Sequence, residues 1–170
     1  GFFNIPVDNL SSMTLMARDI KGSVKNPLIV SPDVGGARRA RALSNKLGIK
    51  MAIVDKNRPE PNVSEVMNII GDVKDYDCIM YDDMVDTAGT LCHAAEALME
   101  AGASSVSAYV THGVLSGNAL ERISSSTLQE VVITDTIHHD NLPAKIRKLS
   151  VAGLFSEAIR RIANEESVSK

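Results

Sequence analysis

Short apolar runs of strand length alternate with helical patterns along most of the chain. Five such runs occur: PLIVSPD, KMAIVDK, CIMYDD, SVSAYVTHG and EVVITDTI. The segments between them, such as GGARRARALSNKLG and TLCHAAEALMEAG, carry apolar residues at helical spacing. Because strands that alternate with helices form a parallel sheet covered on both faces, the sequence predicts an α/β fold with a parallel sheet flanked by helices.

Several expected helices have recognisable ends. The first, over residues 11–21, begins with two serines that can cap a helix. Gly48 and Gly102 stand where the helices before them are expected to stop. Two more helices are expected, near NALERI and in LFSEAIRRIANEE. Residues 57–64 contain two prolines and show no periodicity, so we expect an exposed loop there.

Length and composition limit the class of protein. The 170 residues, 44% of them hydrophobic, fit one globular domain over 1–170. A net charge of only -3 indicates neither nucleic acid nor a membrane surface as a partner. No apolar run approaches the roughly 20 residues that cross a bilayer, so we expect a cytoplasmic protein. Cys78 and Cys92 lack metal-binding spacing and are expected to be buried and reduced.

The unusual residues of the chain gather where parallel sheets bind ligands. Such sheets bind them in the loops at the carboxyl ends of their strands. Polar, glycine-containing segments follow Val30, Val54, Tyr81 and Val110, each at the end of an expected strand. The sequence therefore predicts a ligand site along one edge of the sheet.

The segment after CIMY holds carboxylates and then small residues and hydroxyls. A helix is expected to begin near Thr90, and the free N–H groups of its first turn suit a phosphate monoester. The predicted phosphate loop consists of Thr87, Ala88, Gly89 and Thr90. Asp82 and Asp83 can accept hydrogen bonds from sugar hydroxyls or hold Mg²⁺. A phosphorylated ribose fits both groups, whereas the alternative is that the acids merely end a strand and cap a helix.

Asp86 belongs to the same predicted substrate site, but its orientation is open. A carboxylate beside a bound phosphate repels it unless the side chain turns away to cap the helix. The sequence alone does not choose between these two orientations of Asp86.

These residues resemble the ribose 5-phosphate loop of type I phosphoribosyltransferases and ribose-phosphate diphosphokinases. Three further stretches favour the diphosphokinases. SPDVGGARRAR is similar to their pyrophosphate loop, DKNRPEPNVSEVMNIIGDV to their catalytic flexible loop, and THGVLSGNALERI to the strand and helix that follow. The likeness runs from GFFNIPVDNL to ESVS. It implies a type I phosphoribosyltransferase-like domain that corresponds to the C-terminal half of the family's chain.

The resemblance also implies an activity and roles for particular residues. The family transfers the diphosphoryl group of ATP to the 1-hydroxyl of ribose 5-phosphate, giving phosphoribosyl pyrophosphate and AMP for nucleotide biosynthesis. By this resemblance Lys56 and Arg58 are catalytic and Asp33 holds Mg²⁺. Gly35 and Gly36 let backbone N–H groups approach the diphosphate.

Other polar residues carry different expectations. Most of Arg38, Arg39 and Arg41 are expected to form a solvated helix face, because charged helix faces are common. In the family, the segment that matches ESVS helps to form a regulatory phosphate site, which implies a regulatory role for Ser167 and Ser169.

The resemblance also implies partners for this chain, and two alternative functions stay open. Family chains contain an amino-terminal domain that nothing here matches, and they assemble as homo-oligomers, dimers and then hexamers. The 170 residues alone are therefore expected to bind ribose 5-phosphate with little or no turnover. One alternative is a nucleobase phosphoribosyltransferase, which would not need Lys56 and Arg58. The other is a non-catalytic, synthetase-associated regulatory subunit, which should have lost acids or cations from these loops.

Overall fold

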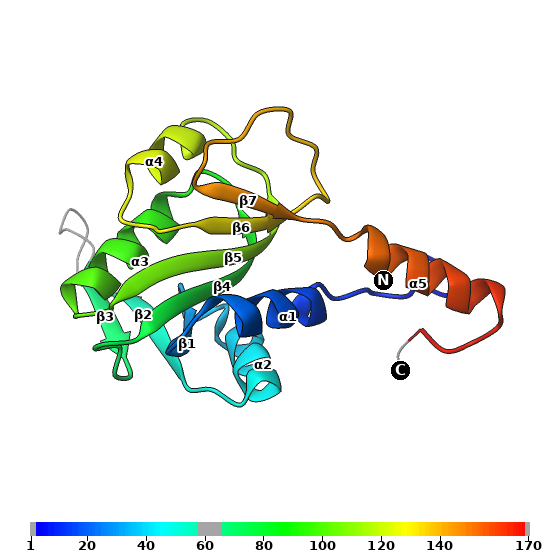
Figure 1. Cartoon of the computed structure of the whole chain (residues 1–170), viewed down its shortest axis with the longest axis horizontal. Coiled ribbons are helices and arrows are strands. Elements are labelled where there is room, and N and C mark those ends of the chain that lie inside the picture. Colours follow the sequence, from blue (N-terminus) through cyan, green and yellow to red (C-terminus); the bar gives the residue numbers. More distant parts are fainter. Residues whose placement is uncertain (1–2, 58–65, 169–170) are drawn as a thin grey trace.

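The computed structural model describes residues 3–57 and 66–168. Within them, one sheet of seven strands has the order β3-β2-β1-β4-β5-β6-β7 (Figure 1). The strands are β1 (Pro27–Ser31), β2 (Met51–Asn57), β3 (Val66–Ile70), β4 (Asp77–Val85), β5 (Ser105–Gly113), β6 (Val131–Thr134) and β7 (Ile146–Leu149). The five expected strands are all present, and the α/β fold class is confirmed.

The sheet is parallel except at one edge. Every pair of neighbouring strands is parallel apart from β2 and β3, which are antiparallel. Only residues 58–65 separate β2 from β3, and a parallel crossover needs a dozen residues or more. The chain therefore returns as a hairpin. The sequence analysis had no strand in this part, and residues 58–64 of its expected loop lie outside the described residues.

Helices cover both faces of the sheet, as predicted. The described helices are α1 (Met13–Ser23), α2 (Ala37–Leu47), α3 (Gly89–Glu100), α4 (Ala119–Ser125) and α5 (Ala152–Ala163). Two buried clusters show the two faces: α1 and α2 pack with Ile29 and Ile79, while α3 and α4 pack with Val30 and Met80. Adjacent strand residues thus point to opposite cores, as the pleat of a strand requires.

The helix ends agree with the sequence at both glycines and, at the start of α1, at one of two serines. Gly48 ends α2 in the left-handed conformation, with φ of 70°, and Gly102 follows α3 with φ of 93°. At the start of α1 one of the two expected serines takes part, since the Ser11 hydroxyl accepts a hydrogen bond from the Met13 N–H at 3.3 Å. The Ser12 side chain makes no capping hydrogen bond, because its hydroxyl lies 2.7 Å from the hydroxyl of Thr111 on β5.

Both cysteines are buried and free, as expected. Burial raises the pKa of the Cys78 thiol to about 12 and also raises the pKa of Cys92. Because the thiolate is the reactive form, both residues are structural rather than nucleophilic.

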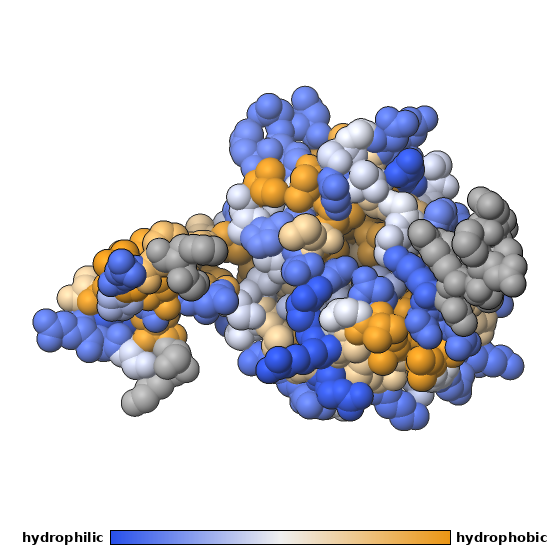
Figure 2. All heavy atoms as spheres, turned by 180° about the vertical axis from the view of Figure 1, so that it is seen from behind, coloured by the Kyte–Doolittle hydropathy of each residue, from blue (hydrophilic) through white to orange (hydrophobic). Residues whose placement is uncertain are grey.

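The C-terminal helix α5 stands apart from the sheet and forms an arm together with the N-terminal segment (Figure 1). Figure 2 shows this arm as a separate lobe beside the main body. It exposes the large apolar side chains of Phe155, Ile159 and Ile162. None of the described helices has the length and apolar character to cross a membrane.

Two neighbouring residues of α3 give a matched test of this packing. Leu98 is fully buried, whereas Met99 is 36% exposed. We expect Leu98→Ala to lower the free energy of unfolding by about 2–5 kcal/mol, because it leaves a cavity in the core. Met99→Ala is expected to cost less than about 1 kcal/mol. Urea denaturation measures both, and equal losses would contradict the packing of α3 on the sheet.

Candidate active site

A pocket of about 200 Å³ lies at the carboxyl edge of the sheet, where the loops after β1 and β4 meet. It brings together Asp33, Asp82, Asp86 and the whole predicted phosphate loop, which are half of the site residues that the sequence singled out. Its lining consists of Pro32, Asp33, Asp82, Met84, Val85, Asp86, Thr87, Ala88, Gly89, Thr90 and Leu91. The two motifs are 50 residues apart in sequence, so their convergence is a result of the fold.

Unequal strand lengths create this pocket. β1 has five residues and β4 has nine, and the pairing of the two strands ends at Val30 and Met80. Beyond that point β4 continues to Val85, paired only with β5. The extra length of β4 carries Asp82 past the end of β1, where the loop that contains Asp33 turns away.

The phosphate loop has the geometry of an anion site. α3 begins at Gly89, after Ala88 in the left-handed conformation with φ of 61°. The first N–H groups of a helix lack partners within the helix and carry its positive dipole end. Ala88 is buried, whereas the side chains of Thr87 and Thr90 are exposed and available to a ligand. This arrangement suits a phosphate group.

The structure answers the question of Asp86. Its carboxylate accepts a short hydrogen bond from the hydroxyl of Ser116, in the loop after β5. The side chain does not cap α3, which has no side-chain capping hydrogen bond. Asp86 therefore turns toward Ser116, a partner that its spacing in the sequence does not indicate.

Asp82 and Asp83 share one cation. Nη2 of Arg39 donates to Oδ1 of Asp82 at 2.6 Å and lies 3.2 Å from Oδ1 of Asp83. Burial raises the pKa of the Asp82 carboxyl, and the hydrogen bond from Arg39 opposes this shift. For Arg39, burial acts to lower the pKa, but the bond to Asp82 and the charge of Asp83 outweigh it and raise the pKa.

Arg39 is a site residue that the sequence analysis missed, since it was grouped with a solvated helix face. It lies in the first turn of α2, directly after the loop that contains Asp33. Its Nε is buried and has no hydrogen-bond partner among the described residues. The available signal was its position, because the first turn of a helix after a parallel strand lies at the ligand edge.

The loop after β1 is also built closely. The hydroxyl of Ser31 donates to the carbonyl of Asp33 at 2.6 Å, and the Gly36 N–H donates to Oδ1 of Asp33 at 2.8 Å. A Cβ atom on Gly36 would lie 2.9 Å from the Ser31 hydroxyl, so a larger residue there would require the Ser31 side chain to move away from Asp33. Gly35 belongs to the same turn, but neither glycine lines the pocket.

Asp33 has the chemistry of a magnesium ligand. Mg²⁺ typically takes one or two carboxylates and fills its other positions with water and substrate phosphates. Asp33 and Asp82 line the same pocket and provide hard carboxylate oxygens. No group of three or more acids, histidines or cysteines that could hold a metal occurs among the described residues. The donor set fits an ion that a bound phosphate helps to hold.

Among the described candidates, Lys56 and Ser167 do not line the pocket. Lys56 is on β2, three residues beyond Ile53, the partner of Ser31, so it lies at the same edge of the sheet. Ser167 follows α5 in the arm, where its carbonyl accepts a hydrogen bond from Arg161. Arg58 and Ser169 lie outside the described residues.

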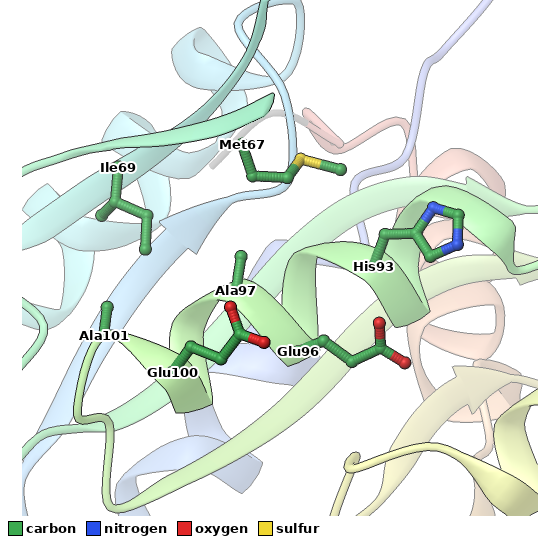
Figure 3. Close-up of a pocket in the computed structure, with 7 residues that line it drawn as sticks. All are labelled: Met67, Ile69, His93, Glu96, Ala97, Glu100 and Ala101. Atoms are coloured by element: carbon green, nitrogen blue, oxygen red, sulfur yellow. The ribbon is translucent and has the colours of Figure 1, made fainter. Parts of the chain in front are cut away.

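A larger hollow of about 970 Å³ lies between β3 and α3 (Figure 3). Met67 and Ile69 form its apolar wall, and His93, Glu96 and Glu100 come from α3. It lies along the middle and C-terminal end of α3, away from the free N–H groups at the start of that helix, and none of the predicted site residues lines it. The smaller pocket is therefore the better candidate for a phosphorylated substrate.

Comparison with solved structures defines the fold class. An APRTase from Giardia lamblia matches with a TM-score of 0.57 and 13% identity, over 81% of this chain and 76% of that protein. At this identity the likeness shows the fold alone, that of the type I phosphoribosyltransferases.

A closer set of relatives defines the family. Residues 56–170 match the family described as "Phosphoribosyl synthetase-associated domain", and the chain belongs to this family. A ribose-phosphate pyrophosphokinase of Caulobacter vibrioides is 59% identical, over 100% of this chain and 57% of the relative. A phosphoribosylpyrophosphate synthetase structure from Mycobacterium smegmatis has a TM-score of 0.87 and 34% identity, over 96% of this chain and 54% of that one. The chain thus spans slightly more than half the length of such relatives.

The contact between Arg39 and Asp82 gives a measurable expectation. Arg39→Gln removes the bond that lowers the pKa of Asp82, so this pKa should rise further and the carboxyl should stay protonated to a higher pH. Carboxyl ¹³C NMR titration in the presence of a chelator measures the change. Arg41→Gln, an exposed arginine of the same helix, is the control. An unchanged pKa of Asp82 in Arg39→Gln would show that the contact is absent in solution.

Proposed function

We propose that this chain is the part of a ribose-phosphate diphosphokinase that binds ribose 5-phosphate and the diphosphate of ATP. The reaction transfers the diphosphoryl group of ATP to the 1-hydroxyl of ribose 5-phosphate, giving phosphoribosyl pyrophosphate and AMP. The observation that carries the proposal is the pocket that the phosphate loop shares with Asp33 and Asp82. The relatives named above support it, and the cytoplasm, where nucleotides are made, is the proposed location.

In this proposal the pocket holds the acceptor in line for transfer. The exposed hydroxyls of Thr87 and Thr90 and the N–H groups at the start of α3 bind the 5-phosphate. Asp82 and Asp83 accept hydrogen bonds from the ribose hydroxyls, which replace part of the present contact of these carboxylates with Arg39. Holding both reactants in line supplies much of the rate in phosphoryl chemistry.

The donor side depends on cations. Asp33 would hold Mg²⁺, which neutralises charge on the diphosphate oxygens when bound. Gly35 and Gly36 let the loop after β1 approach those oxygens. Lys56 and Arg58 stabilise the charge that develops on the transferred group.

A separate regulatory site is also part of the proposal. Ser167 and Ser169 contribute to this regulatory phosphate site.

The proposal includes further protein partners. Residues 1–170 form one phosphoribosyltransferase-like domain, and an amino-terminal domain of the longer chain completes the ATP site. The exposed apolar side chains of Phe155, Ile159 and Ile162 on α5 support such a partner surface, because a stripe of this kind is normally buried. The partner that covers this surface of α5 is either the amino-terminal domain or another subunit of a homo-oligomer, which is a dimer or a hexamer.

Calorimetric titration of ribose 5-phosphate with Mg²⁺ tests the site. We expect saturable binding to the 170-residue chain and at least about tenfold weaker binding to Thr87→Ala/Thr90→Ala, which lacks two hydroxyl donors. Thr14→Ala, an exposed threonine on α1, is the control and should bind like the unchanged chain. Undiminished binding to the double variant would place the ligand elsewhere.

Formation of AMP from ATP and ribose 5-phosphate tests the reaction. In the longest natural chain that contains these residues, Lys56→Ala should lower kcat by about 10³ while the KM for ribose 5-phosphate changes little, since Lys56 acts on the transferred group. Lys25→Ala, an exposed lysine before β1, should leave both constants unchanged. A kcat for Lys56→Ala equal to that of the control would remove Lys56 from the mechanism.

A further inference from the structure

Three consecutive carbonyl groups leading into the phosphate loop are held by one other part of the chain. The carbonyl oxygens of Val85, Asp86 and Thr87 each accept a hydrogen bond from residues 114–122. We call residues 114–122 the bracing segment; it runs from the end of β5 into α4. It was singled out in the sequence only as THGVLSGNALERI, without a role.

The contacts are regular in order. The order of the donors along residues 114–122 follows the order of the carbonyls along residues 85–87. The bonds are Val114 N–H to Val85 at 2.9 Å, Leu115 N–H to Val85 at 3.1 Å, Ser116 N–H to Asp86 at 3.1 Å and Nη1 of Arg122 to Thr87 at 3.0 Å.

These bonds fix the direction of the ligand-binding N–H groups. In a trans peptide the carbonyl of one residue and the N–H of the next point in opposite directions. The carbonyl of Thr87 points to Arg122, so the N–H of Ala88 points away from the bracing segment. The same holds for the N–H groups of Asp86 and Thr87. The loop is thereby set with its donors on the side opposite the bracing segment.

Backbone strain supports a role in holding the loop. Ala88 and Leu115 both adopt left-handed angles, with φ of 61° and 53°, although neither is glycine. They are 3% and 8% exposed and belong to the same buried cluster. Such angles persist only where the surroundings over-determine them, and they concentrate at functional sites. Here the strained residues lie in the two segments that the hydrogen bonds join.

Arg122 places a positive charge beside the phosphate loop. Its guanidinium makes a charge-assisted hydrogen bond, and a Cβ atom on Gly89 would lie only 3.7 Å from its Nη1. The Ser116 hydroxyl holds the carboxylate of Asp86, so it fixes the orientation of that negative charge. Both effects favour an anion in the loop.

We propose that Arg122 and Ser116 are positioning residues that preset the phosphate loop before ribose 5-phosphate binds. This inference rests on the proposed function for the identity of the ligand. Arg122 sets the peptide plane between Thr87 and Ala88, and Ser116 keeps the Asp86 carboxylate away from the phosphate. A loop that is already ordered loses less conformational freedom on binding and so binds more tightly.

Amide hydrogen exchange of the ligand-free chain tests the role of Arg122 without any ligand. We expect Arg122→Gln to speed exchange about tenfold at the hydrogen-bonded amides that flank the loop, those of Ser116 and Cys92, and to leave β1 unchanged. Arg122→Lys should restore most of the protection, since an ammonium can also donate to the carbonyl. Arg18→Gln, an exposed arginine on α1, is the control. Unchanged exchange at Ser116 and Cys92, or faster exchange in β1 as well, would overturn the proposal for Arg122.

Ribose 5-phosphate affinity tests the role of Ser116. Ser116→Ala should raise the Kd about tenfold, because the Asp86 carboxylate can then turn toward the phosphate. The double variant Ser116→Ala/Asp86→Asn should regain affinity, since the charge is gone. A double variant as weak as Ser116→Ala would overturn the role of Ser116. If the unchanged chain fails to bind ribose 5-phosphate, the proposed function and the role of Ser116 fall, whereas exchange still decides the role of Arg122.

Discussion

The parallel pairing of β4 with β1 on one side and β5 on the other is the constraint on which the candidate site depends. β4 extends beyond the end of β1 and stays paired with β5 as far as Val85. Its last residues are therefore rigid and yet open on the side of the β1 loop. Asp82 and the phosphate loop gain a fixed position from this arrangement, and the space beside them becomes the pocket.

The site also has to reconcile three aspartates with an anionic ligand. Each carboxylate after Tyr81 has a partner from another element: Arg39 for Asp82 and Asp83, and Ser116 for Asp86. Unpaired, such a cluster would repel a phosphate and disfavour its own ionisation. Paired, the cluster is partly neutralised by Arg39, and the start of α3 offers its free N–H groups to the phosphate. The acids and the phosphate loop are then compatible within one pocket.

The sequence predicted the parts of this structure that depend on local pattern. Strand and helix periodicity predicted the layers, and the glycine after α2 predicted its end. The convergence of Asp33 with Asp82 followed from the rule for parallel sheets. The sequence did not predict contacts between residues that are far apart along the chain. Arg39 and Asp82 are 43 positions apart, and Ser116 and Asp86 are 30 positions apart. β3 was also missed, because its short apolar run lies within the segment DKNRPEPNVSEVMNIIGDV, which was interpreted as a flexible loop by resemblance.

The most direct test of the account is the response of the backbone amides to ribose 5-phosphate, followed by ¹⁵N NMR. If the phosphate lies at the start of α3, the amides of residues 87–91 shift most, and those of Met67 and His93 in the larger hollow stay unchanged. Shifts that are largest at Met67 and His93 would place the ligand in the hollow between β3 and α3 and contradict the account.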